Sequence, residues 1–343
     1  MLDKMQGYGH EEVVFARDES TGLQTIVAIH STVLGPAVGG TRFWNYDTEE
    51  AAIYDVLRLS RGMTLKNAAA GLKLGGGKAV IIGDPKKLKS QEFFHAYGRI
   101  INSLGGRYYT AEDVNISAQD IAYTNEVTPY VTGRPEISGN PSPYTARGVY
   151  MGIRAGAKEK FGSESLSGKV IAVQGLGSVG YALCELLAKD GAFLKVTDIN
   201  KEAVAKAVAE LGAQEVTDDI IATDCDIFAP CALGAILNTE NVAKLRCAMV
   251  SGCANNVLAD AETGEALEAC DILYLPDYIV NAGGIISCSE EVANASFDKE
   301  VVTRKVDGIY DTTRKVIALA KEKGITTYLA ADEYAMSIIE AEK

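Results

Sequence analysis

The chain has 343 residues, 47% of them hydrophobic, and a formal net charge of −13 at pH 7. A chain of this length exceeds the usual size of one domain, so we expect two domains with a cleft between them. The negative charge argues against nucleic acid or an anionic membrane as a partner, because both attract positively charged surfaces.

The sequence gives no sign of secretion, membrane insertion or metal binding. Charged residues near the N-terminus occupy the place of the apolar core of a signal peptide, and no apolar run reaches the length of a bilayer span. The seven cysteines include no C-x-x-C pair, so we expect reduced and largely buried thiols. The three histidines lack metal-binding spacing, and we expect no metal site. These features predict a cytoplasmic protein.

Strands and helices alternate in the first part of the chain. The predicted elements are a strand at 23–30, a loop or short strand punctuated by glycines at 35, 39 and 40, a helix that begins with a capping-box pattern at Asp47 and Glu50 and ends near Gly62, a strand at 80–82, an amphipathic helix at 90–104 and a short strand at 107–110.

The stretch 63–85 places Lys66 and Lys78 on either side of small residues that include three consecutive glycines, 75–77. These glycines permit positive φ and let a ligand approach the backbone closely. Lys78 leads into the apolar run 79–82. Burial and a neighbouring cation both disfavour an ammonium, so one lysine of the pair could accept a proton near neutral pH. The alternative is a glycine loop with two solvated lysines.

Two acidic residues follow the strand predicted at 107–110. The strand runs into Ala111, Glu112 and Asp113. Carboxylates at a strand terminus lie where α/β proteins commonly assemble their sites. The alternative is that either acid is a solvated loop charge.

A segment rich in glycine, proline and serine, 133–143, predicts a linker, after which the pattern changes. The predicted elements are then a helix at 144–161, strands at 169–174 and 193–197, a helix at 201–211, strands at 226–229, 248–251 and 272–275, one long helix at 298–321 and a capped helix from 326 to the end. This alternation predicts a parallel, doubly wound sheet.

A glycine motif joins the strand at 169–174 to the helix that follows it. The motif has the form G-x-G-x-x-G and consists of Gly175, Gly177, Ser178, Val179 and Gly180 with Leu176. In this context the glycines allow a tight turn and the close approach of a pyrophosphate to a helix N-terminus. Asp198 lies 23 positions after the first glycine. An acid near position 20 binds a ribose 2′-hydroxyl and repels a 2′-phosphate, which favours NAD over NADP. The alternative is a tight βαβ turn without a ligand.

Several motifs together make the chain resemble the glutamate/leucine/phenylalanine/valine amino-acid dehydrogenases, most closely their leucine-specific members. They are KNAAAGLKLGGGKAVIIGDP, GRYYTAEDV, SGNPSP, the glycine motif, CDIFAPCALG and PDYIVNAGG. The resemblance covers nearly the full length and implies a two-domain α/β fold. Residues 1–134 and 322–343 would form the substrate and oligomerisation domain, and 144–321 a Rossmann-type NAD-binding domain. It also implies a homo-oligomer, most often an octamer.

The resemblance implies roles for individual residues. Lys66 would bind the substrate α-carboxylate, Lys78 would be the catalytic lysine, and Asp113 would assist proton transfer at the substrate nitrogen. Asn256 would help to hold substrate and nicotinamide, and the glycine motif with Asp198 would bind NAD. The positions that match the side-chain pocket of the family are Val38, Gly39, Met63, Ala111, Ile285 and Cys288.

The implied reaction is the reversible oxidative deamination of leucine and other branched-chain amino acids to the 2-oxo acid and ammonia. The pocket positions are apolar or small, with no basic residue for the second carboxylate of glutamate. Three departures from the leucine-specific pattern leave a phenylalanine or tryptophan dehydrogenase as the alternative. They are Cys288 in place of a valine, Asn115 within a segment that is usually a glycine-threonine run, and the stretch 290–297. A glutamate dehydrogenase and a non-catalytic NAD-binding protein are more remote alternatives, and each pocket residue could instead be ordinary core.

Overall fold

The computed structural model describes residues 1–134, 136–232, 234–294 and 297–343. The chain divides into two compact units. Unit 1 comprises Met1–Asn140, Ser287–Phe297 and Ala335–Lys343, and unit 2 comprises Pro141–Ile286 and Asp298–Tyr334. The first passage between the units falls within the predicted linker. Position 135 of that linker, position 233 of the CDIFAPCALG motif and positions 295–296 of the divergent stretch lie outside the described residues.

The division differs from the predicted domains in two segments. Residues 322–334 belong to unit 2, because the start of helix α14 (Thr327–Ala341) is held there by hydrogen bonds. Thr327 Oγ1 donates to the carbonyl of Tyr274, and the Tyr278 hydroxyl donates to Asp332 at 2.8 Å. Residues 287–297, in the second half of helix α11 (Gly283–Asn294) and just after it, belong to unit 1, where the side chain of Arg134 binds Glu291.

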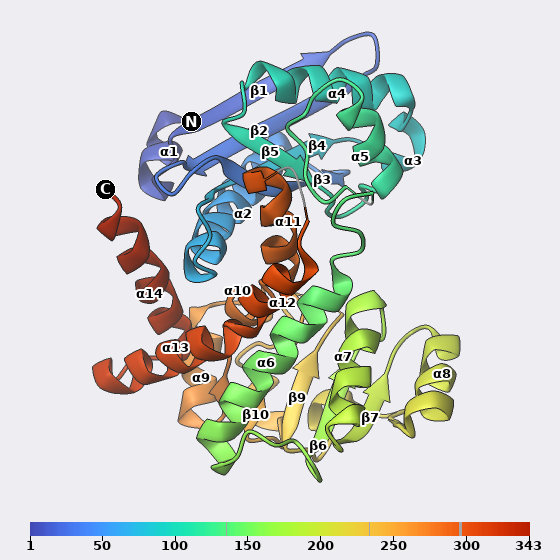
Figure 1. Cartoon of the computed structure of the whole chain (residues 1–343), viewed down its shortest axis with the longest axis vertical. Helices are drawn as coiled ribbons and strands as arrows, with labels where there is room; N and C mark the ends of the chain where they lie inside the picture. The colour runs from blue at the N-terminus through green and yellow to red at the C-terminus, as the bar shows by residue number, and fades with distance from the viewer. Residues whose placement is uncertain (135, 233, 295–296) are drawn as a thin grey trace. The chain divides into compact units, whose positions relative to one another are not determined.

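A five-stranded mixed sheet forms the centre of unit 1 (Figure 1). Its strands are β1 (Glu12–Asp18), β2 (Leu23–Ser31), β3 (Ala37–Trp44), β4 (Gly75–Ile82) and β5 (Tyr108–Ala111), in the order β1-β2-β4-β3-β5. The pairs β1–β2 and β2–β4 are antiparallel, whereas β3 is parallel to both β4 and β5. The carboxyl ends of β3, β4 and β5 therefore lie at one edge of the sheet.

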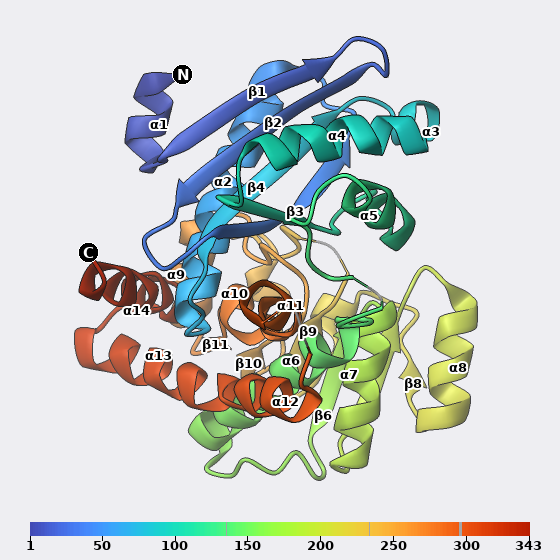
Figure 2. The same cartoon turned by 45° about the horizontal axis from the view of Figure 1, so that its top comes forward.

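Two helices cover opposite faces of this sheet, as Figure 2 shows. Alternation along the strands divides the apolar side chains, since successive residues point to opposite faces. On one face Val27 and Ile81 pack with Phe93 of helix α4 (Gln91–Ser103). On the other, Val80 packs with Val56 of helix α2 (Glu49–Ala69). The smaller helices of the unit are α1 (Leu2–Tyr8), α3 (Pro85–Leu88) and α5 (Ala118–Asn125).

Helix α2 is longer than predicted, and its N-cap lies one residue later than the predicted cap. Thr48, not Asp47, caps it by accepting a hydrogen bond from the Ala51 amide, and the helix runs through Gly62 to Ala69. A glycine inside a helix costs only about 1 kcal/mol, which the buried side chains on either side of Gly62 outweigh. Lys66 consequently lies on the last turn of a helix and not in a loop.

The three consecutive glycines form the start of strand β4 and not the loop of the alternative interpretation. None of them has a positive φ. A Cβ at Gly75 would lie 2.0 Å from the carbonyl oxygen of Ser31, and a Cβ at Gly76 would lie 2.1 Å from the Thr64 nitrogen. The glycines are therefore required because α2 and the neighbouring strand approach β4 too closely for side chains.

We expect the stability of unit 1 to depend on pH, because two of its histidines are buried. His10 bonds Ser60 at 2.7 Å, and His30 bonds Thr64 at 2.8 Å and the Tyr8 carbonyl at 3.0 Å. Burial lowers the pKa of both histidines to about 4. The unfolded chain, with an ordinary histidine pKa, binds more protons between pH 6.5 and 4, so the free energy of unfolding falls as the pH falls through that range.

We expect a loss of about 2 kcal/mol for each histidine between pH 7 and 5. Urea unfolding followed by the fluorescence of the single tryptophan, Trp44 in β3, measures this for unit 1. His30→Gln should remove about half of the effect, whereas His95→Gln, at a histidine outside this cluster, should leave it in place. An unchanged pH dependence in His30→Gln would contradict the prediction.

Unit 2 contains a six-stranded parallel sheet (Figure 1), as predicted. Its strands are β6 (Val170–Gln174), β7 (Phe193–Thr197), β8 (Gln214–Glu215), β9 (Ile227–Pro230), β10 (Met249–Val250) and β11 (Leu273–Tyr274). The order β11-β10-β9-β6-β7-β8 is that of a Rossmann fold, with the strand order reversing between β6 and β9. The helices α6 (Ser142–Phe161), α7 (Ser178–Lys189), α8 (Lys201–Leu211), α9 (Ala261–Ala269) and α10 (Asp277–Val280) connect and cover the strands.

The long helix predicted at 298–321 is two helices. They are α12 (Lys299–Asp307) and α13 (Ile309–Lys323), and Gly308 separates them. Glycine is a poor helix former, and here it serves as the C-cap of one helix and the N-cap of the next. Across the described ranges, no helix combines the length and the apolar character that a bilayer span requires.

Candidate active site

An ion pair between a buried lysine and a half-buried aspartate connects two strands of unit 1. Lys78 is on strand β4 and only 6% exposed, and its Nζ donates a hydrogen bond of 2.6 Å to Oδ2 of Asp113. Asp113 lies just beyond the carboxyl end of β5. The neighbouring Glu112 is an exposed residue. The structure thus joins the two residues predicted to be catalytic.

A missing side chain on β3 makes this pair possible. The register of β3 and β4, with Val38 opposite Gly76 and Thr41 opposite Ala79, sets Gly40 level with Lys78. A Cβ at Gly40 would lie 2.3 Å from the carbonyl oxygen of Glu112 and 2.9 Å from the Cβ of Asp113. The chain after β5 can therefore cross β3 at Gly40 and bring the carboxylate to the lysine.

Lys66 lies on the helix that covers the same face of the sheet. Val80 of β4 packs against α2. Lys78 and Gly76 precede Val80 by two and four residues on the same strand, so these positions are on the same face of the sheet. The backbone of α2 approaches β4 most closely where Thr64 meets Gly76. Lys66 follows Thr64 by two residues, as Lys78 follows Gly76, and it is half-buried. The two lysines therefore belong to the same α2–β4 contact.

Asp113 is held ionised by its cationic neighbours. Burial alone would raise the pKa of the Asp113 carboxyl, but the charge and hydrogen bond of Lys78, followed by the charge of Arg42, lower that pKa below its usual value. The ground state of this structure is accordingly a carboxylate that accepts a hydrogen bond from the lysine.

A second carboxylate, which we did not predict, orients Arg42. Arg42 Nη1 donates to Asp55 at 2.7 Å, and its Nε lies 3.7 Å from Asp113. Asp55 also accepts hydrogen bonds from Tyr46 and Arg58. One signal was available in the sequence, because Asp55 stands among the apolar residues of the buried face of α2 and a buried acid requires partners.

Four of the predicted pocket residues lie near this pair. Val38 and Ala111 share its face of the sheet, since Val38 pairs with Gly76 and Ala111 pairs with Gly40. A Cβ at Gly39 would lie 3.3 Å from Cγ of Met63 on α2. Val38 is fully buried, and Met63 and Ala111 are half-buried.

Cys288 lies in the part of α11 that belongs to unit 1. Its carbonyl accepts a hydrogen bond of 2.8 Å from Thr132, and burial raises the pKa of its thiol to about 12. A neutral, buried thiol is an apolar surface of roughly the size of a small aliphatic side chain. Ile285 lies one turn earlier on the same helix, in the part that belongs to unit 2.

The departure at Asn115 has a backbone explanation. Asn115 has a φ of 57°, and its side chain donates to the carbonyl of Phe43 at 3.0 Å. Glycine is the usual residue at such a left-handed position, and asparagine is among the few other residues that tolerate it. Asn115 can therefore take this backbone conformation without requiring a different path of the chain after Asp113.

The glycine motif of unit 2 has the form that a dinucleotide requires. Gly175 has a φ of 101°, and a Cβ at Gly180 would lie 2.1 Å from the Gly175 carbonyl oxygen, so both positions need glycine. A Cβ at Gly177 would meet nothing within 4 Å. Gly177 caps α7 without a side-chain hydrogen bond, and Ser178 is exposed and Val179 half-buried. The first amides of α7 thus face open space and fit a phosphate group.

Asp198 lies beside this motif at the end of β7. One carboxylate oxygen accepts a hydrogen bond of 2.5 Å from the Leu176 amide within the motif, and the other accepts one of 2.7 Å from the Asn200 amide. A carboxylate oxygen has two acceptor sites, so Asp198 retains capacity for a ligand hydroxyl. These residues fit the adenosine part of a dinucleotide.

Asn256 lies in the loop that follows β10, at the carboxyl edge of the same sheet. It has a φ of 51° and is exposed, and its carbonyl accepts a hydrogen bond of 2.6 Å from the Ala235 amide. The preceding Asn255 has its side-chain oxygen bound to Asn281 at 2.9 Å. Asn256 is thus presented to solvent by a loop that its neighbours fix.

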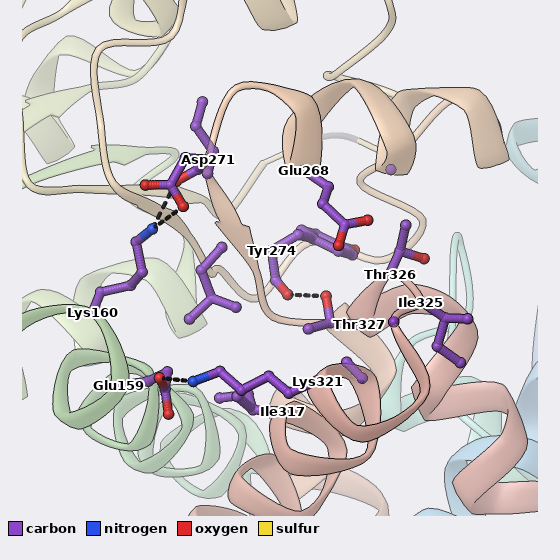
Figure 3. Close-up of a pocket in the computed structure, with 15 residues that line it drawn as sticks. Glu159, Lys160, Glu268, Asp271, Tyr274, Ile317, Lys321, Ile325, Thr326 and Thr327 are labelled. Atoms are coloured by element: carbon purple, nitrogen blue, oxygen red, sulfur yellow. Dashed lines mark hydrogen bonds and ion pairs between the residues drawn. The ribbon is translucent and has the colours of Figure 1, made fainter.

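A cavity elsewhere in unit 2 contains none of the predicted site residues. Its volume is about 500 Å³, and Figure 3 shows Lys160 paired with Asp271 and Lys321 paired with Glu159 at its wall. It adjoins the last turn of α6 and the start of β11, at the amino edge of the sheet. Ligands of open α/β sheets bind at the carboxyl edge, so this cavity is not the dinucleotide site. Among the described residues no group of three or more His, Cys, Asp or Glu could hold a metal ion.

Comparison with known proteins identifies the family. The model of the Glu/Leu/Phe/Val dehydrogenase dimerisation domain matches residues 10–130, and that of the glutamate/leucine/phenylalanine/valine dehydrogenases matches residues 192–342. The chain is 52% identical over 340 residues to a leucine dehydrogenase of Geobacillus stearothermophilus. The aligned residues cover 98% of this chain and 92% of that protein. The chain is 44% identical to a phenylalanine dehydrogenase of Caldalkalibacillus thermarum, with coverage of 95% and 90%.

The fold is that of a solved relative. The crystal structure of L-tryptophan dehydrogenase from Nostoc punctiforme matches with a TM-score of 0.89 and 40% identity, and it covers 100% of this chain and 99% of that one. The predicted two-domain α/β fold is thereby confirmed, and dehydrogenases of this kind depend on a pyridine nucleotide. The chain belongs to the glutamate/leucine/phenylalanine/valine dehydrogenase family.

Proposed function

We propose that the protein catalyses the NAD-dependent, reversible oxidative deamination of leucine and other branched-chain L-amino acids to the 2-oxo acid and ammonia. The contact of the buried Lys78 with Asp113 is the single observation that carries this proposal. A proton donor and a proton acceptor in contact, beside an apolar face, are what the chemistry at an amine-bearing carbon needs.

The residues of unit 1 have separate tasks in this proposal. The ammonium of Lys66 offsets the α-carboxylate of the substrate. Lys78, after giving up its proton, takes one from the water that attacks the substrate iminium carbon. Asp113 accepts and returns a proton at the substrate nitrogen.

The glycine motif and Asp198 would hold NAD. The chemistry that NAD supplies when bound is the acceptance of a hydride from the substrate α-carbon. The preference for NAD over NADP rests on the charge of Asp198, which would repel a 2′-phosphate. Asn256, with its exposed side chain, would orient the substrate and the nicotinamide.

An apolar side chain is the best fit to the candidate pocket. Val38, Gly39, Met63 and Ala111 offer no cation for a second substrate carboxylate, which disfavours glutamate. The identity to a leucine dehydrogenase favours a branched-chain substrate. Cys288, a buried and neutral thiol, and Ile285 match further side-chain pocket positions of the family and also offer no cation. A valine-sized wall replaced by a thiol changes discrimination by only ~1–3 kcal/mol, so a phenylalanine or tryptophan dehydrogenase is the second candidate, favoured by the identity to those enzymes.

The test is the oxidation of NADH with ammonia over five 2-oxo acids: 4-methyl-2-oxopentanoate, 3-methyl-2-oxobutanoate, phenylpyruvate, indolepyruvate and 2-oxoglutarate. We expect the highest kcat/KM with the two branched acids, and at least tenfold less with NADPH, in line with one repulsive contact of about 1.4 kcal/mol or more. A preference for phenylpyruvate or indolepyruvate would select the aromatic alternative. A preference for 2-oxoglutarate would make the protein a glutamate dehydrogenase. No measurable activity with any of the five acids would overturn the enzymatic proposal.

We also propose that the protein acts in the cytoplasm as a homo-oligomer, with an octamer as the expected size. The match of residues 10–130 to a dimerisation domain supports self-association through unit 1. Light scattering after size-exclusion chromatography measures the mass directly. A mass equal to that of the 36.5 kDa chain would contradict the assembly.

A further inference from the structure

Two pairs of cysteines lie at the two ends of one strand pair in unit 2. Cys225 and Cys247 precede β9 and β10, and Cys231 and Cys253 follow the same strands. The members of each pair are 22 positions apart. None of the four takes part in a disulfide in this structure.

The register of the strands sets Cys225 opposite Cys247. Asp224 forms a parallel bridge with Arg246 on one side, and Ile227 pairs with Met249 on the other. Neighbouring strands lie about 4.8 Å apart, and opposite residues of a parallel pair point to the same face. A disulfide needs Cα atoms roughly 4.4–6.8 Å apart and side chains directed to one another. This pair therefore has the backbone geometry of a disulfide before the bond exists.

The two thiols differ in acidity because they share one proton. A hydrogen bond from the Cys225 thiol, together with those from the backbone amides of Phe228 and Met249, lowers the pKa of Cys247 despite its burial. The same interaction raises the pKa of Cys225. The thiolate is the nucleophilic form of cysteine, so Cys247 is the attacking sulfur and Cys225 its neighbouring thiol.

The pair is open to small molecules. Both cysteines are half-buried and line an open depression of about 810 Å³, together with Arg246 and the exposed Cys270. The depression is at the amino edge of the sheet, the edge opposite to the glycine motif. Its chemistry is therefore independent of the proposed deamination.

We propose that Cys225 and Cys247 form a dithiol oxidation site that a hydroperoxide converts to an intrachain disulfide. The thiolate sulfur of Cys247 attacks one oxygen of the O–O bond; an S–O bond forms, the O–O bond breaks, and the leaving oxygen takes a proton as water or an alcohol. The Cys225 thiol then loses its proton, attacks the sulfenic sulfur and displaces hydroxide, which leaves as water. Two thiols lose two electrons in total, and the peroxide gains them.

The second pair provides a control within the same strands. The Cys253 thiol is directed to the carbonyl oxygen of Cys231 at 3.8 Å. Its interaction with the Cys231 side chain, together with burial, raises the pKa of Cys253. A protonated, enclosed thiol reacts slowly with peroxides, so the pair of Cys231 and Cys253 should remain reduced while the first pair oxidises.

The experiment treats the full-length protein with hydrogen peroxide, alkylates the remaining thiols and maps the disulfides by mass spectrometry. Cleavage at Lys, Arg and Asp separates Cys225 from Cys231, and peptide fragmentation distinguishes Cys247 from Cys253. We expect a bond between Cys225 and Cys247 that dithiothreitol reverses. The rate at which this bond forms should exceed the rate of oxidation of Cys270, an exposed thiol, by at least about tenfold.

Three variants assign the two sulfurs. Cys225→Ser should leave a sulfenic acid on Cys247 that dimedone traps, and Cys247→Ser should slow the oxidation of Cys225 by about tenfold or more. Cys270→Ser should leave the disulfide unchanged. The proposal is overturned if Cys270 oxidises while Cys225 and Cys247 stay reduced, if the bond forms between Cys231 and Cys253 instead, or if Cys247→Ser leaves Cys225 as reactive as before.

Discussion

Replacing Lys78 by alanine should lower kcat for oxidative deamination by about 10²- to 10⁴-fold, the range that a positioned acid–base group contributes. The substitution removes the group that would take a proton from the attacking water, and it leaves Asp113 without its hydrogen-bond partner. Arg42, whose Nε is 3.7 Å from Asp113, remains to offset part of that charge. Steady-state kinetics with the preferred amino acid and NAD measures the effect.

A matched control for this prediction lies five positions earlier in the chain. Lys73 is an exposed lysine that precedes the same strand, and Lys73→Ala should retain kcat within about twofold, as surface substitutions usually do. Because the glycine motif belongs to unit 2, Lys78→Ala should also bind NAD as the unmodified protein does. This measurement separates a lost proton acceptor from an unfolded protein. Near-normal kcat in Lys78→Ala would remove Lys78 from the mechanism.

Sequence reasoning predicted unit 2 well because its signals are local. Strands of a parallel sheet are buried on both faces and read as short apolar runs, as at β6 and β9. The glycine motif marks the first turn, and helix α8 begins and ends at the predicted residues 201 and 211. The prediction of one long helix at 298–321 was wrong at Gly308, because glycine interrupts some helices and not others. Strand β8, with two exposed residues, has no apolar signal.

In unit 1 the errors come from contacts between segments far apart in the chain. Glycines 75–77 suggested a loop because glycine permits positive φ, but they are glycines because α2 and β2 lie against them. Gly62 suggested a helix end, yet the helix continues, since buried residues follow it on the side of the sheet. A glycine looks the same in the sequence whether it forms a turn or allows two segments to approach closely. Only tertiary packing decides between a flexible turn and a close approach.

The same limit applies to the candidate site. The resemblance gave Lys78 and Asp113 separate catalytic roles, but their contact depends on the register of β3 with β4 and β5, which the sequence does not show. Arg42 and Asp55 were missed because each looks like an ordinary charge until the fold brings them together at 2.7 Å. The candidate catalytic residues were recognisable from the sequence, whereas the residues that position them were not.

Gly40 tests whether this positioning matters. A methyl group at Gly40 would lie 2.3 Å from the carbonyl oxygen of Glu112 and 2.9 Å from Cβ of Asp113, so the chain after β5 must move away from β3. We expect Gly40→Ala to cost about 1–3 kcal/mol of unfolding free energy, as overpacking does. We also expect a fall in kcat of about 100-fold, the effect of displacing a catalytic group by about 1 Å.

Gly62→Ala is the control for this prediction. Gly62 lies within α2, where a Cβ would meet nothing within 4 Å, and alanine there should raise the unfolding free energy by about 0.5–1 kcal/mol with kcat unchanged. The two substitutions add the same methyl group to the same unit and should act in opposite directions on stability. If Gly40→Ala loses stability but keeps kcat, the approach of Asp113 to Lys78 across β3 does not control the reaction. A loss of kcat that Gly62→Ala does not share would establish that the missing side chain at Gly40 is a condition for catalysis.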